Sequence, residues 1–91
     1  MDYLKKYHDD MVKELQNIVK IKSVEDYATA SDNRPFGNGP GEVLEYTLSL
    51  CEKLGMKTTN LDGYVGFAEV GEGKDMIALL SHLDVVPEGD L

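Results

Sequence analysis

The chain has 91 residues, and its 17 acidic and 9 basic residues give a formal net charge of -8 at pH 7. A chain of this length forms one domain at most. Binding to nucleic acid without sequence preference requires clustered lysines and arginines, whereas the basic residues here are scattered, so nucleic-acid and anionic-membrane partners are disfavoured. The sole cysteine, Cys51, cannot form an internal disulfide, and a reducing cytoplasm is the simplest location.

Targeting signals are not evident in the sequence. No run of residues approaches the ~18 apolar positions that a membrane span requires. Residues 1–8 also lack the apolar segment of a secretory signal peptide. We therefore expect a cytoplasmic protein with no membrane partner.

Two helices are predicted in the first part of the chain. Between Asp2 and Lys20, apolar residues recur at spacings of three and four, which is typical of one helical face. A second helix is predicted to begin at Pro40 and to end at Gly55, which favours a left-handed cap. Residues 23–40 lack periodicity, and so long a loop is more often functional or mobile than idle. The predicted apolar faces are Leu4, Tyr7, Met11, Val12, Leu15, Ile18 and Val19 in the first helix, and Val43, Leu44, Thr47, Leu48, Cys51 and Leu54 in the second.

A hairpin and a further strand are predicted next. Residues 57–61 and 64–70 show the pattern of short strands, and Asp62-Gly63 between them is a two-residue turn signal. Residues 76–80 form an unbroken apolar run, which fits an interior strand covered on both faces. The predicted fold class is therefore α/β, with layered helices on a mixed β-sheet. One edge of the last strand would remain open, so the sequence reads as the opening of a larger domain.

His82 and Asp84 are the strongest candidates for chemistry. They follow the apolar run, and layered sheets present ligand-binding residues at the carboxyl ends of their strands. In extended backbone both side chains would share one face, with Leu83 turned toward the core. A neutral imidazole is a common metal ligand, and a nearby carboxylate can accept its other N–H. The alternative is that His82 only caps the strand and Asp84 only begins a turn.

A wider stretch carries a family resemblance. Residues 76–90, MIALLSHLDVVPEGD, resemble the first metal-binding motif of the co-catalytic zinc metallopeptidases that include aminoacylase, carboxypeptidase G and carnosinase. Residues 64–73 and 36–41 look like the dipeptidase V branch, the bacterial Xaa-His or carnosine-type dipeptidases. The resemblance implies a hydrolase that cleaves dipeptides with metal-activated water, and a catalytic domain that carries two zinc ions, with Mn²⁺ or Co²⁺ as alternatives. It implies that residues 1–91 are the N-terminal part of that domain, without the lid or dimerisation domain.

The resemblance transfers only two residue roles. His82 looks like the ligand of one metal ion, and Asp84 looks like the catalytic-site acid that orients its imidazole. The bridging Asp, the adjacent Glu-Glu pair and the distant His of the family are not identifiable here. Glu88 and Asp90 are expected to be solvated loop charges. The chain alone is therefore expected to lack dipeptidase activity and to bind zinc weakly.

Other interpretations remain open. The chain could be a non-catalytic interaction module that pairs through the open edge of the strand at residues 76–80, with a partner or with a second copy. A single metal ion could also be shared between chains. Tyr27, Arg34 and Phe36 could line a substrate entrance, although a solvated loop is the simpler expectation. The remaining candidates, His8 and Cys51, are read as a helix residue and a small buried hydrophobe.

Overall fold

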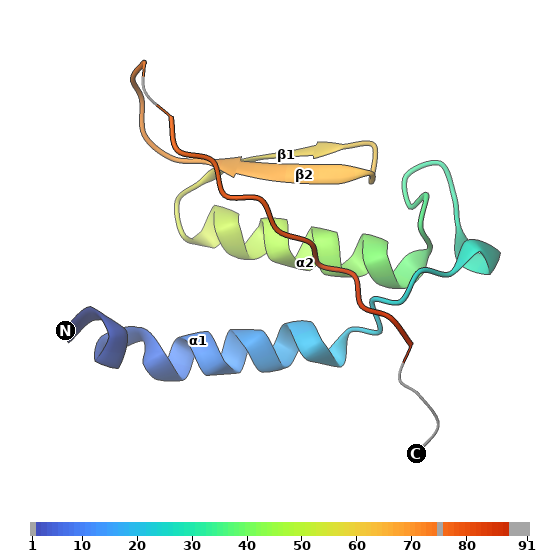
Figure 1. The fold of residues 1–91 in the computed structure, drawn as a ribbon, viewed down its shortest axis with the longest axis horizontal. Coiled ribbons are helices and arrows are strands. Elements are labelled where there is room, and N and C mark those ends of the chain that lie inside the picture. Colours follow the sequence, from blue (N-terminus) through green and yellow to red (C-terminus); the bar gives the residue numbers. More distant parts are fainter. Residues whose placement is uncertain (1, 75, 88–91) are drawn as a thin grey trace.

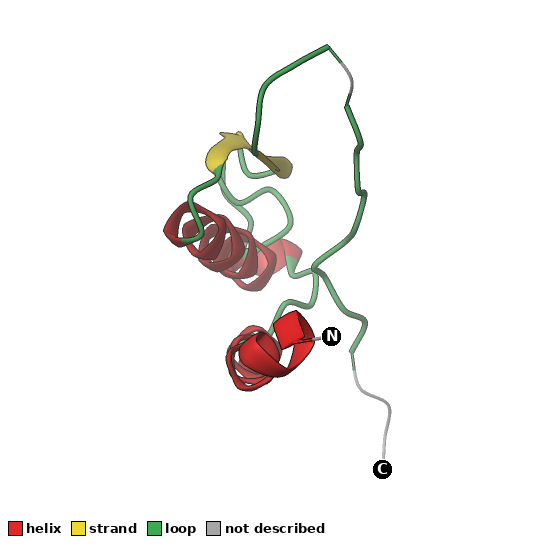
Figure 2. Cartoon of the chain, turned by 90° about the vertical axis from the view of Figure 1, so that its left-hand side faces the viewer, coloured by secondary structure: helices red, strands yellow, loops and turns green. Residues whose placement is uncertain are grey.

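The computed structural model describes residues 2–74 and 76–87, and its helices and hairpin confirm the α/β class (Figure 1). The elements are α1 (Asp2–Lys20), a short 3-10 helix (Tyr27–Thr29), α2 (Asn38–Lys53), β1 (Lys57–Leu61) and β2 (Val65–Glu69). Figure 2 shows α2 in the middle, with α1 on one side of it and the hairpin on the other. The predicted bounds of α1 and β1 are confirmed.

The second helix begins earlier than predicted, at Asn38 and not at Pro40. The reason is a side-chain cap from the preceding loop, because the Asn38 N–H donates to Thr29 Oγ1 at 2.9 Å. A free N–H of the first helical turn is thereby satisfied. At the other end, Gly55 adopts a φ of 90°, which confirms the predicted left-handed stop.

The hairpin forms at the predicted turn. Asp62 and Gly63 have φ angles of 55° and 79°, so both adopt the positive φ that tight hairpin turns favour, although the connection is one residue longer than the predicted two and includes residue 64. The strands are antiparallel, and Leu61 pairs with Val65 beside the turn. Strand β2 is shorter than the predicted range of 64–70. A Cβ on Gly63 would lie 2.1 Å from the Asn33 carbonyl oxygen, so the turn lies directly against the long loop.

The small core lies between α2 and the hairpin. Val43 is only 1% exposed, and among the described residues no other large apolar side chain is fully buried. A Cβ on Gly66 of β2 would lie 2.9 Å from Leu44 Cδ1 and from a Leu48 methyl group, so the glycine lets the strand approach the helix closely. Leu44, Thr47, Leu48 and Cys51 are half-buried. The predicted inner face of α2 is therefore confirmed up to Cys51, whereas Leu54 is 68% exposed.

The predicted strand at residues 76–80 is wrong. These residues have no regular secondary structure, and their large apolar side chains, Met76, Ile77, Leu79 and Leu80, are between 85% and 99% exposed. The backbone leaves the hairpin through Gly71 and Gly73, both with positive φ, and Figure 2 shows the segment running apart from the hairpin. Among residues 2–74 and 76–87 no strand lies beside the segment to pair its amides and carbonyls, and the sheet that these residues form is the antiparallel pair β1 and β2 and not a mixed sheet.

The apolar face of α1 is also more exposed than predicted. Its exposed members are Leu4, Tyr7, Met11, Val12, Leu15 and Val19. The helix approaches α2 on the side that carries Glu14, and the Tyr46 hydroxyl donates to Glu14 Oε2 at 2.6 Å. Among the α1 residues whose side chains are described, the half-buried ones are Glu14, Asn17 and Ile18. The periodicity predicted the helix correctly, but among the described residues little covers its apolar stripe.

Candidate functional site

A cavity of about 340 Å³ lies where the long loop, α2, the hairpin and residues 81–84 meet. Its walls are mainly apolar, and its ionisable side chains other than the Tyr64 phenol come from two segments, Glu25 in the loop and the run from Ser81 to Asp84. The apolar side chains that line it are Phe36, Pro40, Val43, Leu44, Tyr64, Val65 and Leu83. Both sequence-predicted site residues, His82 and Asp84, therefore line the same cavity.

One backbone contact brings the distant segments together. Val24 forms an isolated parallel β-bridge with Val85, and the Val85 N–H donates to the Ser23 carbonyl at 3.2 Å. Ser23 is buried. The bridge places Glu25 and Asp84 on the lining of one cavity although they are far apart in the sequence.

The imidazole of His82 is held at one nitrogen. Nδ1 lies 3.1 Å from the Asp84 carbonyl oxygen and 3.3 Å from Asp84 Oδ1. When Nδ1 carries the proton it can donate to either oxygen, and Nε2 then keeps its lone pair for another partner. The His82 and Asp84 side chains are 86% and 63% exposed. Leu83 between them is half-buried, as the alternation predicted, although the segment is not a strand.

An aromatic pair forms another part of the cavity lining. The rings of Phe36 and Tyr64 lie edge to face, with centroids 5.6 Å apart and an interplanar angle of 87°. The Asp26 N–H donates to the Phe36 carbonyl at 2.8 Å and fixes this part of the loop. The sequence left the role of Phe36 open, and it did not identify Tyr64 or Glu25 as site residues. No sequence signal could have found them, because only the fold brings these segments together.

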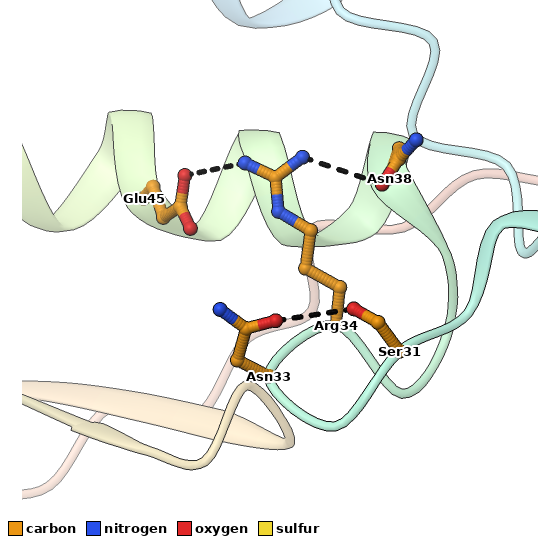
Figure 3. A network of polar contacts seen from close by, with 5 residues as sticks. All are labelled: Ser31, Asn33, Arg34, Asn38 and Glu45. Carbon is orange, nitrogen blue, oxygen red and sulfur yellow. Dashed lines mark hydrogen bonds and ion pairs between the residues drawn. The ribbon is translucent and has the colours of Figure 1, made fainter.

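Arg34 fastens the loop to α2 and does not line the cavity. Its Nη2 donates to Glu45 Oε2 at 2.7 Å, and its Nη1 lies 3.5 Å from Asn38 Oδ1 (Figure 3). Below it, Ser31 Oγ donates to Asn33 Oδ1 at 3.1 Å. A Cβ on Gly41 would lie 2.5 Å from Arg34 Cγ, so the arginine stem lies flat on the helix. The alternative that Arg34 lines a substrate entrance is therefore not supported, because its guanidinium forms a loop-to-helix contact.

Two tyrosines have a pKa above the ordinary value of a tyrosine. The Tyr27 hydroxyl donates to the Glu25 carboxylate, and this hydrogen bond, together with the negative charge of Glu25, raises the pKa of Tyr27 above 10.0. The hydrogen bond to Glu14, followed by burial, raises the pKa of Tyr46 above the same value. Tyr27 therefore touches the cavity only through Glu25, and it is not among the residues that line it.

The described residues offer one imidazole at the cavity. A catalytic zinc ion takes about three protein ligands and leaves one position open. Within residues 2–74 and 76–87, no group of three or more His, Cys, Asp or Glu side chains is placed to hold a metal ion. His8 lies on α1 beside Asp9, and Cys51 is half-buried in α2. Glu88 and Asp90 lie outside the described residues.

Comparison with known proteins gives a consistent result. No family model matches the chain. It is 46% identical over 82 residues to a Bacillus subtilis (strain 168) protein, and 37% identical over 87 residues to proteins of Staphylococcus aureus strains USA300 and NCTC 8325. All three are named "Putative dipeptidase". The matches cover 90% and 96% of this chain, but only 18% and 19% of the relatives.

In the described part of the chain, neither helix has the length and apolar character needed to cross a membrane. The sequence similarity extends over nearly the whole chain, because the alignments comprise 82 and 87 of its 91 residues. The chain is therefore homologous to a part of these dipeptidase-named proteins, and it spans about a fifth of their length.

Proposed function

We propose that the chain is the N-terminal part of a cytoplasmic, zinc-dependent dipeptidase and that it contributes one metal ligand, His82. The similarity to dipeptidase-named proteins supports the peptidase class. The resemblance of residues 64–73 and 36–41 favours the carnosine-type branch. The observation that carries the proposal is the exposed His82 ring, whose Nδ1 lies beside the carbonyl oxygen and Oδ1 of Asp84 while Nε2 is left for a ligand.

Each of the two residues has a distinct role in this proposal. Asp84 accepts a hydrogen bond from the Nδ1–H group, fixes the tautomer and orients the ring, while His82 offers its Nε2 lone pair. A zinc ion supplies Lewis acidity and lowers the pKa of a water molecule when it is bound at such a site. The described residues fit one position in its ligand set. The remaining ligands and the general base must come from elsewhere in a complete enzyme.

The test is a titration of the 91-residue chain with zinc. NMR signals of the ring nitrogens of both histidines are measured at each zinc concentration. We expect weak binding at His82 Nε2, complete loss of that binding in His82→Ala, and affinity that is about tenfold lower in Asp84→Asn. His8→Ala is the matched control, because His8 also has a neighbouring aspartate, with Nδ1 3.2 Å from Asp9 Oδ1. Zinc binding that survives His82→Ala, or that needs His8, would refute the assignment.

The isolated chain is expected to turn over no dipeptide, because one imidazole does not complete a hydrolytic zinc site. Incubation of the purified chain with zinc and a dipeptide, with product amino acids measured, tests this. Turnover that is abolished both by a chelator and by His82→Ala would show that the chain is a complete enzyme.

Self-association is the second candidate function. It is favoured by the exposure of Met76, Ile77, Leu79 and Leu80, which form a continuous apolar run. The charge of -8 on each copy opposes such a dimer. Sedimentation equilibrium separates the two candidates. A monomer at all concentrations would exclude self-association, and a dimer that Leu79→Lys dissolves would support it.

A further inference from the structure

We infer that the cavity beside His82 accepts an apolar side chain of the substrate and rejects an acidic one, and that Phe36 and Tyr64 determine this specificity. The inference rests on the proposed dipeptidase function, because it identifies the substrate class that the same cavity would admit. It depends on the chemistry of the cavity walls and not on the metal ligand itself.

The shape and composition of the cavity favour an apolar group. Its volume of about 340 Å³ lies within the range of roughly 300–1,000 Å³ that is typical of small-molecule pockets. Most of the lining is aliphatic or aromatic, and Phe36 and Tyr64 are themselves exposed to solvent. A ligand side chain placed against these two rings would remove apolar surface from water on both partners.

The charge of the cavity opposes an acidic side chain. Glu25 and Asp84 are the lining residues with ionisable carboxylates, and no Lys or Arg is among the described residues that line the cavity. Arg34, the arginine of the loop, is already paired with Glu45 at 2.7 Å. A ligand side-chain carboxylate in this cavity would therefore lose water and meet two carboxylates with no Lys or Arg beside them, which is a penalty that discriminates against acidic side chains.

The aromatic pair is held in place before any ligand arrives. The backbone hydrogen bond from Asp26 holds Phe36 itself, and the ion pair between Arg34 and Glu45 holds the loop two residues before it. Gly63 places the hairpin turn against the Asn33 carbonyl, and Tyr64 follows immediately. Because these groups need little rearrangement, binding would cost little ordering entropy.

The experiment compares two dipeptides that differ in one side chain, leucyl-glycine and aspartyl-glycine, by NMR titration of the 91-residue chain. We expect leucyl-glycine to bind about tenfold more tightly, a difference that burial of one leucine side chain can supply. The chemical-shift changes that leucyl-glycine causes should be largest at the Phe36 and Tyr64 rings. Equal affinity for the two dipeptides, or binding that leaves both rings unperturbed, would overturn the inference.

Variants separate recognition from general damage to the fold. Phe36→Ala and Tyr64→Ala should each reduce the preference for leucyl-glycine, whereas Tyr64→Phe keeps the ring and should retain it. Phe67→Ala is the matched control, because Phe67 is an exposed aromatic residue of β2 that does not line the cavity. If Phe67→Ala lowers the preference as much as Phe36→Ala does, the two rings are not the determinants.

The outcome is independent of the test of the proposed function. If zinc does not bind at His82, the dipeptidase proposal fails regardless of the measured affinities for the two dipeptides. If zinc binds at His82 but the two dipeptides bind equally, only the substrate preference fails.

Discussion

Val24 and Val85 form a parallel β-bridge that joins the loop after α1 to the segment after His82 and Asp84. The Ser23 carbonyl, which belongs to a buried residue, accepts the Val85 N–H at 3.2 Å. This contact is the backbone hydrogen bond that ties the described part of the last segment to the rest of the chain. The position of the candidate site therefore depends on the backbone of residues 22–24.

Substitution of Gly39 tests this dependence. A Cβ at Gly39 would lie 1.8 Å from the Lys22 carbonyl oxygen, so alanine must displace the loop backbone. An ordinary Gly-to-Ala change within a helix stabilises it by about 1 kcal/mol. We expect the opposite sign for Gly39→Ala, a loss of about 1–3 kcal/mol from overpacking.

The measurements for Gly39→Ala are urea denaturation and the hydrogen exchange rate of the Val85 amide, which should increase. Ser49→Ala, at an exposed position of α2, is the control and should change neither. A Gly39→Ala variant more stable than the parent chain would contradict the close approach.

The core valine offers a second prediction. Val43 is 1% exposed, whereas Val19 of α1 is 73% exposed, and both lie in helices. Val43→Ala should lower the free energy of unfolding by about 2 kcal/mol, because it leaves a cavity between α2 and the hairpin. Val19→Ala should change it by no more than about 0.5 kcal/mol. Denaturation curves that show equal effects for the two variants would mean that Val43 is not central to the core.

The Arg34 to Glu45 ion pair should be modest in strength. Its side chains are 28% and 49% exposed, so solvent screens the attraction. A double-mutant cycle with Arg34→Met and Glu45→Gln should give a coupling energy of about 0.5–1 kcal/mol, and added salt should reduce it. A coupling energy near zero at low salt would show that the pair does not hold the loop in solution.

The contact between Tyr46 and Glu14 predicts a pH dependence. Because the hydrogen bond to Glu14 and burial raise the pKa of Tyr46 above its unfolded value of 10.0, the neutral phenol is favoured in the folded chain. This contribution is fully present below pH 10.0 and is lost as the pH rises through the folded pKa. The stability difference between the parent chain and Tyr46→Phe should be constant from pH 8 to about pH 9 and should shrink above pH 10.0.

Chemical denaturation at several pH values measures that difference. Tyr27, whose pKa is also raised, is present in both proteins and cancels from the comparison. A difference that grows above pH 10.0 would reverse the assigned sign and exclude the Glu14 hydrogen bond as its source.

Local signals predicted the elements whose stability is local. The periodicity of residues 2–20 gave the bounds of α1, and Asp62-Gly63 gave the hairpin turn, because helical periods and tight turns depend on neighbouring residues. The alternation around Leu83 correctly predicted that His82 and Asp84 would lie together. Their common cavity was not visible in the sequence pattern.

Non-local contacts account for what the sequence could not predict. Thr29 caps α2 from the loop and moves its start to Asn38, and the Val24 to Val85 bridge brings Glu25 to the cavity. The apolar run at residues 76–80 has the composition of an interior strand, but a strand requires neighbours with free backbone groups. Composition alone does not say whether such neighbours are in place.

The way α1 is attached has a consequence for how the molecule opens. A helix of 19 residues with most of its apolar face exposed gains little from tertiary packing, and an isolated helix of that length is only marginally stable in water. The core around Val43 lies between α2 and the hairpin, so we expect it to remain when α1 detaches. The amides of α1 should therefore exchange with solvent first, through a partial unfolding step that precedes global unfolding.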